Sequence, residues 1–410
     1  MRDLFVMAWR NLGRNRRRTG LSLAAVAFAV GVLVFAKAMQ VGSYAQMIEG
    51  MVTVNTGHLQ VQYPGYFDDG DINLSVDDPG AVFTEAERLP DVAAAVARVT
   101  TGMLVAHGDR SFGVLAIGTD AAREAKVTRI SKVMREGNYL DADDSDGVII
   151  GDKLARNLGA EIGDELVLIG LAADGTTAAA KTHVRGIFGA GVPDMDRQTL
   201  MANLEAMRSW TVMEGRATQV AILLSDHRAI ESTRAALTEA LRAKGMKDVV
   251  LSWDELLPGL EQAIQLDKGS GQIMYGILLL VVAFGILNTF LMSAMERTRE
   301  FGVLLAVGVK PATCGFLIFL ESQLLFLMGF FAGLALGGAV TGYFAHVGIK
   351  FEGGEAVMEQ WGIAGAVYPQ MTAGVGVDVF VMVAVIVAAV ALYPAWRVTR
   401  LLPVNAMRYV

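Results

Sequence analysis

The stretch GSGQIMYGILLLVVAFGILNTFLMSAM, from Gly269 to Met295, contains no charged side chain. A helix needs about 20 apolar residues to cross a bilayer, and this stretch exceeds that length. Three further runs are similarly apolar, namely Thr19–Ala36, Ser322–Phe344 and Val379–Trp396. With 53% hydrophobic and only 19% charged residues, the 410-residue chain is predicted to be a membrane protein with four transmembrane helices.

The first apolar run follows a basic N-terminus and so could be taken for a cleaved signal peptide. It is longer than the apolar core of such a peptide, about 7–15 residues, and no clear A-x-A cleavage site follows it. We therefore expect it to stay in the protein as a membrane anchor.

Basic residues gather on one side of the predicted helices. The three basic groups are Arg2, Arg10, Arg14, Arg16, Arg17 and Arg18; Arg297, Arg299 and Lys310; and Arg397, Arg400 and Arg408. Residues 43–266 instead hold 20 basic and 33 acidic side chains. The positive-inside rule predicts that both termini and the 295–315 loop are cytoplasmic and that the acidic segment is translocated. The net charge of −7 comes mainly from that segment and does not indicate nucleic-acid binding.

The translocated segment mixes strand and helix patterns. Alternation predicts strands in HLQVQYP (58–64), FGVLAIGTD (112–120) and DELVLIG (164–170). Amphipathic periodicity predicts helices in EAERLPDVAAAVARV (85–99) and in SDHRAIESTRAALTEALRAKG (225–245), the latter starting at Ser225. We expect an α+β domain, in one piece or two subdomains. It contains no cysteine, since the single cysteine is Cys314, and so has no disulfide.

The sequence lacks the motifs of several catalytic and metal sites. It has no G-x-S-x-G and no G-x-x-x-x-G-K-[ST], so we expect neither a serine nucleophile of that type nor ATP bound by a P-loop. The five histidines lack zinc-site spacing. The carboxylates at Asp141, Asp143, Asp144 and Asp146 lack the glycine and terminal glutamate of a calcium loop, and a solvated turn is expected. We predict no catalytic residue, metal or cofactor on this chain.

Glu321 is the one acid expected inside a span, because it lies ten residues beyond Pro311 and so one to two turns inside the membrane. It needs a partner there, either a hydrogen bond to another span or, in a proton-coupled transporter, a relay. Lys37 and Asp378 are expected at the outer interface. Gly333 and Gly337 give the third span a small-xxx-small face, which packs either within the chain or on a second permease subunit.

Two motifs near the C-terminus resemble those of a known family. MERTREFGVLLAVGVKPATCGFLIFLES (295–322) and YPAWRVTRLLPVNAMR (393–408) resemble the FtsX-like permeases of ABC transporters. VIIGDKLARNLGAEIGDELVLIG (148–170) and HVRGIFGAGVPDMD (183–196) resemble the MacB-type periplasmic core. The arrangement of one span, a large domain and three spans is similar to that of the lipoprotein-release (Lol) permeases.

The resemblance implies that Met295–Gly315 is a coupling helix on the inner membrane surface. It would dock in a groove of a separate ABC ATPase subunit, which works as a dimer and binds the ATP and magnesium. The implied polar contacts are Glu296, Arg297, Arg299 and Glu300, and the implied apolar anchors are Phe301, Leu304 and Leu305.

The implied function is that of the permease subunit of a mechanotransmitting ABC transporter in the bacterial inner membrane. It would extract lipoprotein or another amphiphile from the membrane or periplasm. Its implied partners are the ATPase, a second permease copy or paralogue, membrane lipid, and a periplasmic chaperone or outer-membrane-directed protein. The alternatives are an FtsX-like scaffold that controls a periplasmic cell-wall hydrolase, and a secondary transporter that uses Glu321.

The expected fold is an α-helical membrane protein with four transmembrane helices and a large extracytoplasmic α+β domain, MacB-like, between helices one and two. The predicted boundaries are an amphipathic segment at 1–18, helix one at 19–42, the domain with its stalk at 43–265, helix two at 269–295, a coupling helix at 296–314, helix three at 315–344, an outer loop at 345–376, helix four at 377–396 and a cytoplasmic tail at 397–410.

Overall fold

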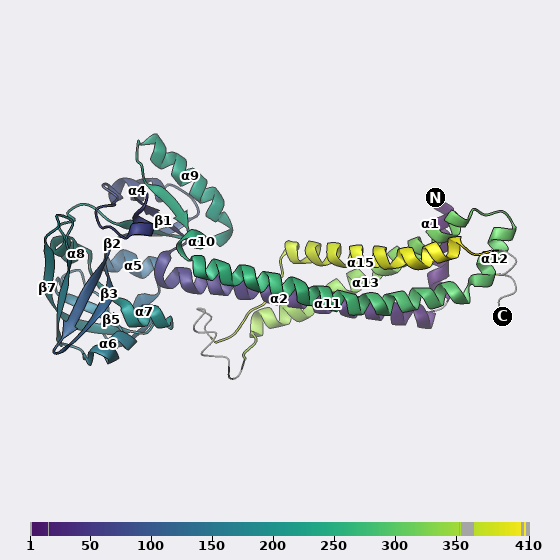
Figure 1. The fold of residues 1–410 in the computed structure, drawn as a ribbon, viewed down its shortest axis with the longest axis horizontal. Coiled ribbons are helices and arrows are strands. Elements are labelled where there is room, and N and C mark those ends of the chain that lie inside the picture. The colour runs from purple at the N-terminus through teal and green to yellow at the C-terminus, as the bar shows by residue number, and fades with distance from the viewer. Residues whose placement is uncertain (1, 15, 352, 354–364, 403–405, 407–410) are drawn as a thin grey trace. The chain divides into compact units, whose positions relative to one another are not determined.

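A computed structural model describes residues 2–14, 16–351, 353, 365–402 and 406 (Figure 1). The middle of the predicted outer loop and half of the predicted tail lie outside the described residues. The chain divides into two compact units. We call Met1–Tyr44, Ile264–Lys350 and Ala366–Val410 the membrane unit, and Ala45–Ala263 with Phe351–Gly365 the α+β unit.

Among the described residues, four helices are long and apolar enough to cross a membrane. These helices are α2 (Arg16–Met51), α11 (Pro258–Glu296), α13 (Pro311–Val347) and α15 (Ala373–Thr399). Each extends beyond the apolar run that predicted it. Two shorter helices complete the membrane unit, α1 (Arg2–Arg14) and α12 (Thr298–Ala306).

The third membrane helix begins and ends at residues suited to those positions. Pro311 occupies the first turn of α13, where its missing N–H costs no helical hydrogen bond. Gly348 follows the last residue with a φ of 74°, in a region that favours glycine. These two residues fix the length of α13.

The glycine face of α13 packs against α2 inside the chain. A Cβ atom at Gly333 would lie 2.5 Å from the carbonyl oxygen of Ala27, and one at Gly337 would lie 2.7 Å from that of Gly31. Only glycine allows so close a helix approach. The structure therefore places Gly333 and Gly337 in an intramolecular contact, beside an apolar core that α2, α11, α13 and α15 share.

The α+β unit is built on a single ten-stranded sheet. Its strands are β1 (Leu59–Gln62), β2 (Val92–His107), β3 (Arg110–Thr119), β4 (Met134–Gly137), β5 (Gly147–Gly151), β6 (Glu165–Leu171), β7 (Thr177–Phe188), β8 (Thr199–Asn203), β9 (Gln219–Leu224) and β10 (Val249–Ser252). Its helices are α3 (Tyr66–Asp69), α4 (Pro79–Ala86), α5 (Ala121–Val127), α6 (Asp152–Leu158), α7 (Pro193–Gln198), α8 (Leu204–Thr211), α9 (Ile230–Ala243) and α10 (Trp253–Leu256).

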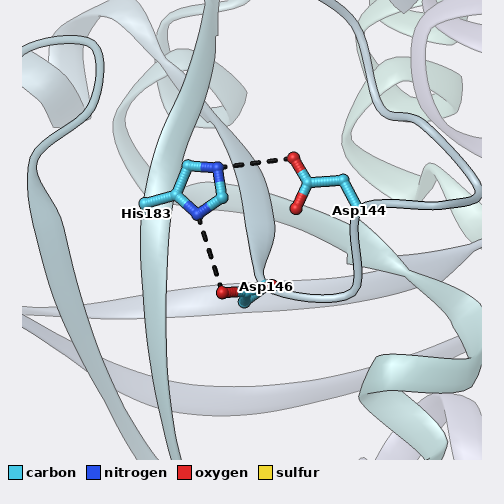
Figure 2. A group of neighbouring side chains, drawn as sticks. All are labelled: Asp144, Asp146 and His183. Carbon is cyan, nitrogen blue, oxygen red and sulfur yellow. Dashed lines mark ion pairs between the residues drawn. The ribbon is translucent and has the colours of Figure 1, made fainter.

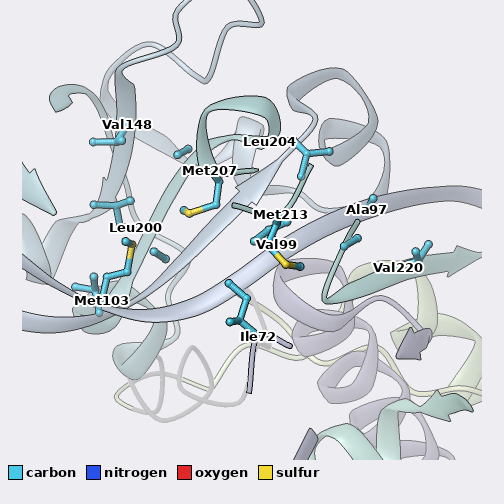
Figure 3. Close-up of a cluster of buried hydrophobic side chains, with 14 of the residues drawn as sticks. Ile72, Ala97, Val99, Met103, Val148, Leu200, Leu204, Met207, Met213 and Val220 are labelled. Carbon is cyan, nitrogen blue, oxygen red and sulfur yellow. The ribbon is translucent and has the colours of Figure 1, made fainter. Parts of the chain in front are cut away.

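The sheet runs in the order β10-β1-β9-β2-β3-β8-β5-β7-β4, with β6 pairing β2 and β7. Only the β3–β8 and β5–β7 pairs are parallel. The 16-residue β2 pairs β9 with its first half and β6 with its second, so one strand joins the two halves. A continuous apolar core covers the sheet and includes Ile72, Val99, Met103, Leu200, Met207 and Val220 (Figure 3). The structure thus has one sheet and not two separate subdomains.

The helix predicted over residues 85–99 is wrong for most of its length. Helix α4 ends at Ala86, and β2 begins at Val92 after Pro90. The four alanines at 93–95 and 97 favour a helix locally, but this part of β2 pairs with β9 from Val92 to Arg98. Sheet pairing has overridden local propensity.

Two further predictions need correction. The helix expected from Ser225 begins at Ile230, because Asp226 caps a separate 3₁₀ turn by accepting from the Arg228 N–H. Strand β1 is fully buried rather than half-buried, since β9 and β10 flank it. Its Gln60 side chain donates to the Thr56 carbonyl at 2.8 Å.

Candidate functional site

The candidate site is the segment that joins α11 to α13, Arg297–Lys310, which we call the coupling segment. Arg297 leaves helical geometry with ψ near 11°, and α12 starts after it. Gly308 has a φ of 97° and donates to the Leu305 carbonyl, which ends α12. The coupling segment is therefore a short helix with a defined break at each end.

One face of α12 is buried in the membrane unit. Thr298, Phe301 and Gly302 are buried, and the Phe301 side chain has no exposed area. The residues packed in the same cluster are Ala8, Ala294, Cys314, Leu317, Ile318, Leu324 and Val398, with Leu304 and Leu305 at its edge. Phe301 is thus enclosed by its own chain and does not present the anchor that the resemblance implied.

The opposite face of α12 is exposed and mixes apolar with basic side chains. Val303 is 50% exposed and Val307 80%. The exposed residues Arg299, Val303 and Ala306 follow helical spacing on α12, and exposed Val307 and Lys310 follow its end; we call these five residues the docking face. Arg299 was among the residues implied by the resemblance, but the two valines were not. Val303 lies four residues after Arg299 and Val307 four residues after Val303, and this spacing is the signal that could have identified them.

Arg297 points inward and joins two carboxylates. Its Nη1 donates to both oxygens of Glu321, at 2.9 and 2.8 Å, and its Nε donates to Glu300 at 3.0 Å. The side chains of Arg297 and Glu321 are only 13% and 12% exposed. The resemblance implied that Arg297 contacts the ATPase, but its side chain points inward. Glu296 and Arg299, for which the same contact was implied, are exposed.

The N-terminal helix supplies the remaining partners. Asn11 donates to Glu321 at 2.5 Å, and Arg14 pairs with Glu300. Burial favours a higher pKa for the Glu300 carboxyl, but Arg14 and Arg297 outweigh it and lower this pKa. Glu321 therefore has the partner it was expected to need, but that partner is an arginine at a helix junction and an asparagine of α1.

A small cavity of about 30 Å³ adjoins Glu321, enough space for about one water molecule. Polar groups of Asn11, Thr19, Ser22, Glu321 and Ser322 line it. The remaining core of the four long helices is mainly apolar, with Tyr275 and Thr341 as buried polar exceptions among the described residues. The polar environment of Glu321 is thus local.

A second cluster of polar side chains lies in the α+β unit (Figure 2). The His183 Nε2 is 3.3 Å from Asp144, and its Nδ1 is 4.0 Å from Asp146. Arg185 donates to Asp144 at 2.6 Å. Burial favours a higher pKa for the Asp144 carboxyl, but its contacts with Arg185 and His183 outweigh burial and lower this pKa. Asp144 is 17% exposed, so the expected solvated turn is wrong at this residue.

These residues do not fit a bound cation well. Both ring nitrogens of His183 already face carboxylates of the same turn, Asp144 and Asp146. The Arg185 guanidinium already occupies Asp144. We interpret the cluster as ion pairs that attach the 141–146 turn to β7.

Comparison with known families and proteins gives matches over most of the chain. Residues 19–240 match the MacB-like periplasmic core domain, and residues 273–403 match the FtsX-like permease C-terminal family. The lipoprotein-releasing system transmembrane protein LolC of Xylella fastidiosa is 23% identical over 333 residues, which are 78% of each chain. The macrolide export ATP-binding/permease protein MacB of Hyphomonas neptunium is 24% identical over 360 residues, 84% of this chain and 54% of that protein.

Among solved structures, the periplasmic region of MacB from Actinobacillus actinomycetemcomitans aligns with a TM-score of 0.38 and 14% identity. The alignment covers 52% of this chain and 95% of that one. The match to the MacB-like core alone covers more than half of the sequence, and the FtsX-like match covers the last three membrane helices. The chain belongs to the family of ABC transporter permeases with a MacB-like periplasmic core and an FtsX-like C-terminal region.

Proposed function

We propose that the chain is the permease subunit of a mechanotransmitting ABC transporter and extracts lipoprotein or another amphiphile from the inner membrane or periplasm. A separate ATPase subunit, working as a dimer, binds ATP and magnesium and supplies the energy. The observation that carries this proposal is the docking face, a basic and apolar surface on a short helix between two membrane helices.

The coupling segment suits the transfer of force. Phe301 and Arg297 anchor its inner face in the membrane unit. In the described part of the chain its outer face is exposed, so a partner can reach it. Exposed Val303 and Val307 supply apolar contact area, and Arg299 and Lys310 supply charge at its two ends. A partner that presses on this face moves α11 and α13 with it.

The membrane unit favours extraction over transport through a pore. The described side chains buried between its four long helices are mainly apolar, and the polar ones beyond the surroundings of Glu321 include Tyr275 and Thr341. An amphiphile with a lipid anchor can leave the membrane without crossing such a core. A lipoprotein is the favoured cargo because LolC, a lipoprotein-releasing protein by name, aligns over the same large share of both chains.

Further partners belong to the proposal. A second permease copy or paralogue completes the membrane part, and a periplasmic chaperone or outer-membrane-directed protein receives the cargo. The first experiment purifies the chain from its native membrane and identifies the associated proteins by mass spectrometry. An ATPase with a lipoprotein supports the proposal, an ATPase with a cell-wall hydrolase supports the scaffold, and the absence of any ATPase contradicts both.

Substitution of the docking face tests the proposed contact directly. We expect Val303→Asp and Val307→Asp each to reduce the co-purified ATPase at least about tenfold, because a charge in an apolar contact must be desolvated. Val212→Asp, which changes an exposed valine of the α+β unit, is the matched control. Full ATPase recovery with both docking-face variants would show that the partner binds elsewhere.

A further inference from the structure

Five polar side chains fasten the N-terminal helix to the coupling segment and to α13. They are Asn11 and Arg14 of α1, Arg297 and Glu300 of the coupling segment, and Glu321 of α13, and we call them the polar clamp. Each carboxylate has one partner on α1 and shares Arg297 as the other. Arg297 is therefore the centre of the clamp, and α1 is attached at both carboxylates.

The clamp is chemically balanced. Two guanidinium groups face two carboxylates, and the amide of Asn11 supplies a neutral donor. The Glu321 carboxylate is nearly buried, so its ion pair is screened little by water. Only a guanidinium has the fork of donors needed to bind both oxygens of Glu321 and also reach Glu300.

Apolar contacts of α1 support the same attachment. Ala8 is fully buried in the cluster that contains Phe301, and Leu12 packs at the edge of that cluster. The Thr19 hydroxyl of α2 donates to the Leu12 carbonyl at 2.9 Å, which connects α1 to the beginning of α2. Helix α1 thus lies in contact with the coupling segment on one side and with α2 on the other.

We propose that Arg297 and Glu321 are positioning residues that make α1 move together with α12, so that a displacement of the coupling segment also reaches α2 through α1. This inference rests on the proposed function, because the displacement comes from the ATPase. Without the clamp, movement of α12 reaches α2 through the packing of α13 against α2. With it, α1 also carries the movement directly to the beginning of α2.

The test uses Arg297→Lys in the full chain purified with its ATPase. Lysine retains the positive charge beside Glu321 but lacks the fork that reaches Glu300. Hydrogen exchange of the α1 amides is measured by mass spectrometry without nucleotide and with ATP plus vanadate. Arg17→Lys is the matched control, since it makes the same substitution at an exposed residue outside the clamp.

In the natural chain and in Arg17→Lys, exchange in α1 should be equal in the two states because α1 follows α12. In Arg297→Lys it should rise without nucleotide and rise further with ATP plus vanadate. An equal rise in both states would mean that the clamp stabilises α1 but does not couple its movement to α12. No rise in either state would mean that the clamp does not hold α1 in place.

A second variant and a nucleotide-free measurement cover the cases in which Arg297→Lys does not fold or no ATPase co-purifies. If Arg297→Lys fails to fold, Arg14→Gln removes one α1 contact at a side chain that is 65% exposed, and the same exchange pattern is expected. If no ATPase co-purifies, the proposed function has failed. The clamp is then judged on the nucleotide-free chain alone, where unchanged α1 exchange in Arg297→Lys would contradict it.

Discussion

In the described part of the chain, two arginine–glutamate pairs are largely shielded from water, and their surroundings differ. In the periplasmic α+β unit, Arg98 and Glu124 form two hydrogen bonds at 2.9 and 2.7 Å and are 2% and 0% exposed. In the membrane unit, Arg297 and Glu321 form a similar pair at the edge of a small cavity. The first pair is enclosed on all sides, and the second is open on one.

The partners of each pair explain the difference. Glu124 also accepts from Thr119 and Thr128, and Arg98 donates to the Asn55 carbonyl, all within one compact unit. The partners of Arg297 and Glu321 come from α1, α12 and α13, which are separate helices. A pair whose partners share one core stabilises a fold, whereas a pair whose partners lie on separate helices can link their movements.

Removal of one member of the enclosed pair should have the largest effect. We expect Arg98→Ala to reduce the free energy of unfolding of the periplasmic unit by about 3–5 kcal/mol, because Glu124 is left as a buried charge without its arginine. Hydrogen exchange of β2 amides in the full chain measures this loss. Arg123→Ala, which breaks an exposed pair with Glu87, should cost less than about 1 kcal/mol. Equal losses would contradict the distinction.

The same pair predicts the pH dependence of the periplasmic unit. Burial favours a higher pKa for Glu124, but Arg98 and the two threonine hydroxyls outweigh it, so the pKa is lowered. A lowered pKa adds stability that is present above the ordinary value of about 4.3 and is lost as the pH falls through the folded value. Unfolding measured from pH 6 downward should show this loss, and Glu124→Gln should reduce the slope. An unchanged slope would locate the dependence elsewhere.

The open pair should contribute less to stability. We expect Arg297→Ala to cost about 1–3 kcal/mol, less than Arg98→Ala, because both side chains keep some exposure to water. Cys314 is buried in the adjacent cluster, so its rate of reaction with a thiol reagent reports local opening. The double variant Arg297→Ala/Glu321→Ala should cost less than the sum of the two single variants. Additive costs would mean that the two residues do not act as a pair.

Much of the membrane unit could be predicted from the sequence, because a helix that crosses the bilayer needs an apolar run long enough to match the bilayer thickness. The four long helices follow from the uncharged runs, whereas the short helix at 298–306 was expected from the resemblance to FtsX-like permeases. Which face of α12 is buried could not be predicted, because it depends on where α1 and α13 lie. Phe301 and Val303 are both apolar, and only tertiary packing separates them.

The periplasmic unit shows a second limit. Arg98 and Glu124 are 26 positions apart, and no local pattern links them. The alanine-rich stretch at 92–99 favours a helix by itself, yet it forms the strand on which Arg98 lies. Long-range pairing of this kind depends on the arrangement of the whole sheet. Sequence patterns therefore predict the class of the fold but not its ion pairs.

Asp248, a half-buried acid with no arginine partner in the described residues, gives the smallest expected effect. Burial, together with the nearby charge of Asp77, raises the pKa of Asp248, and its Oδ1 accepts no hydrogen bond within the described residues. A raised pKa means that ionisation opposes folding above that value, so stability falls as the pH rises through it. Asp248→Asn should therefore stabilise the periplasmic unit at neutral pH by up to about 1 kcal/mol, measured by hydrogen exchange of β10. Asp254→Asn at the start of α10 is the control, because that carboxylate accepts from Ser252. Destabilisation by Asp248→Asn would mean that this acid has a partner and belongs with Glu124.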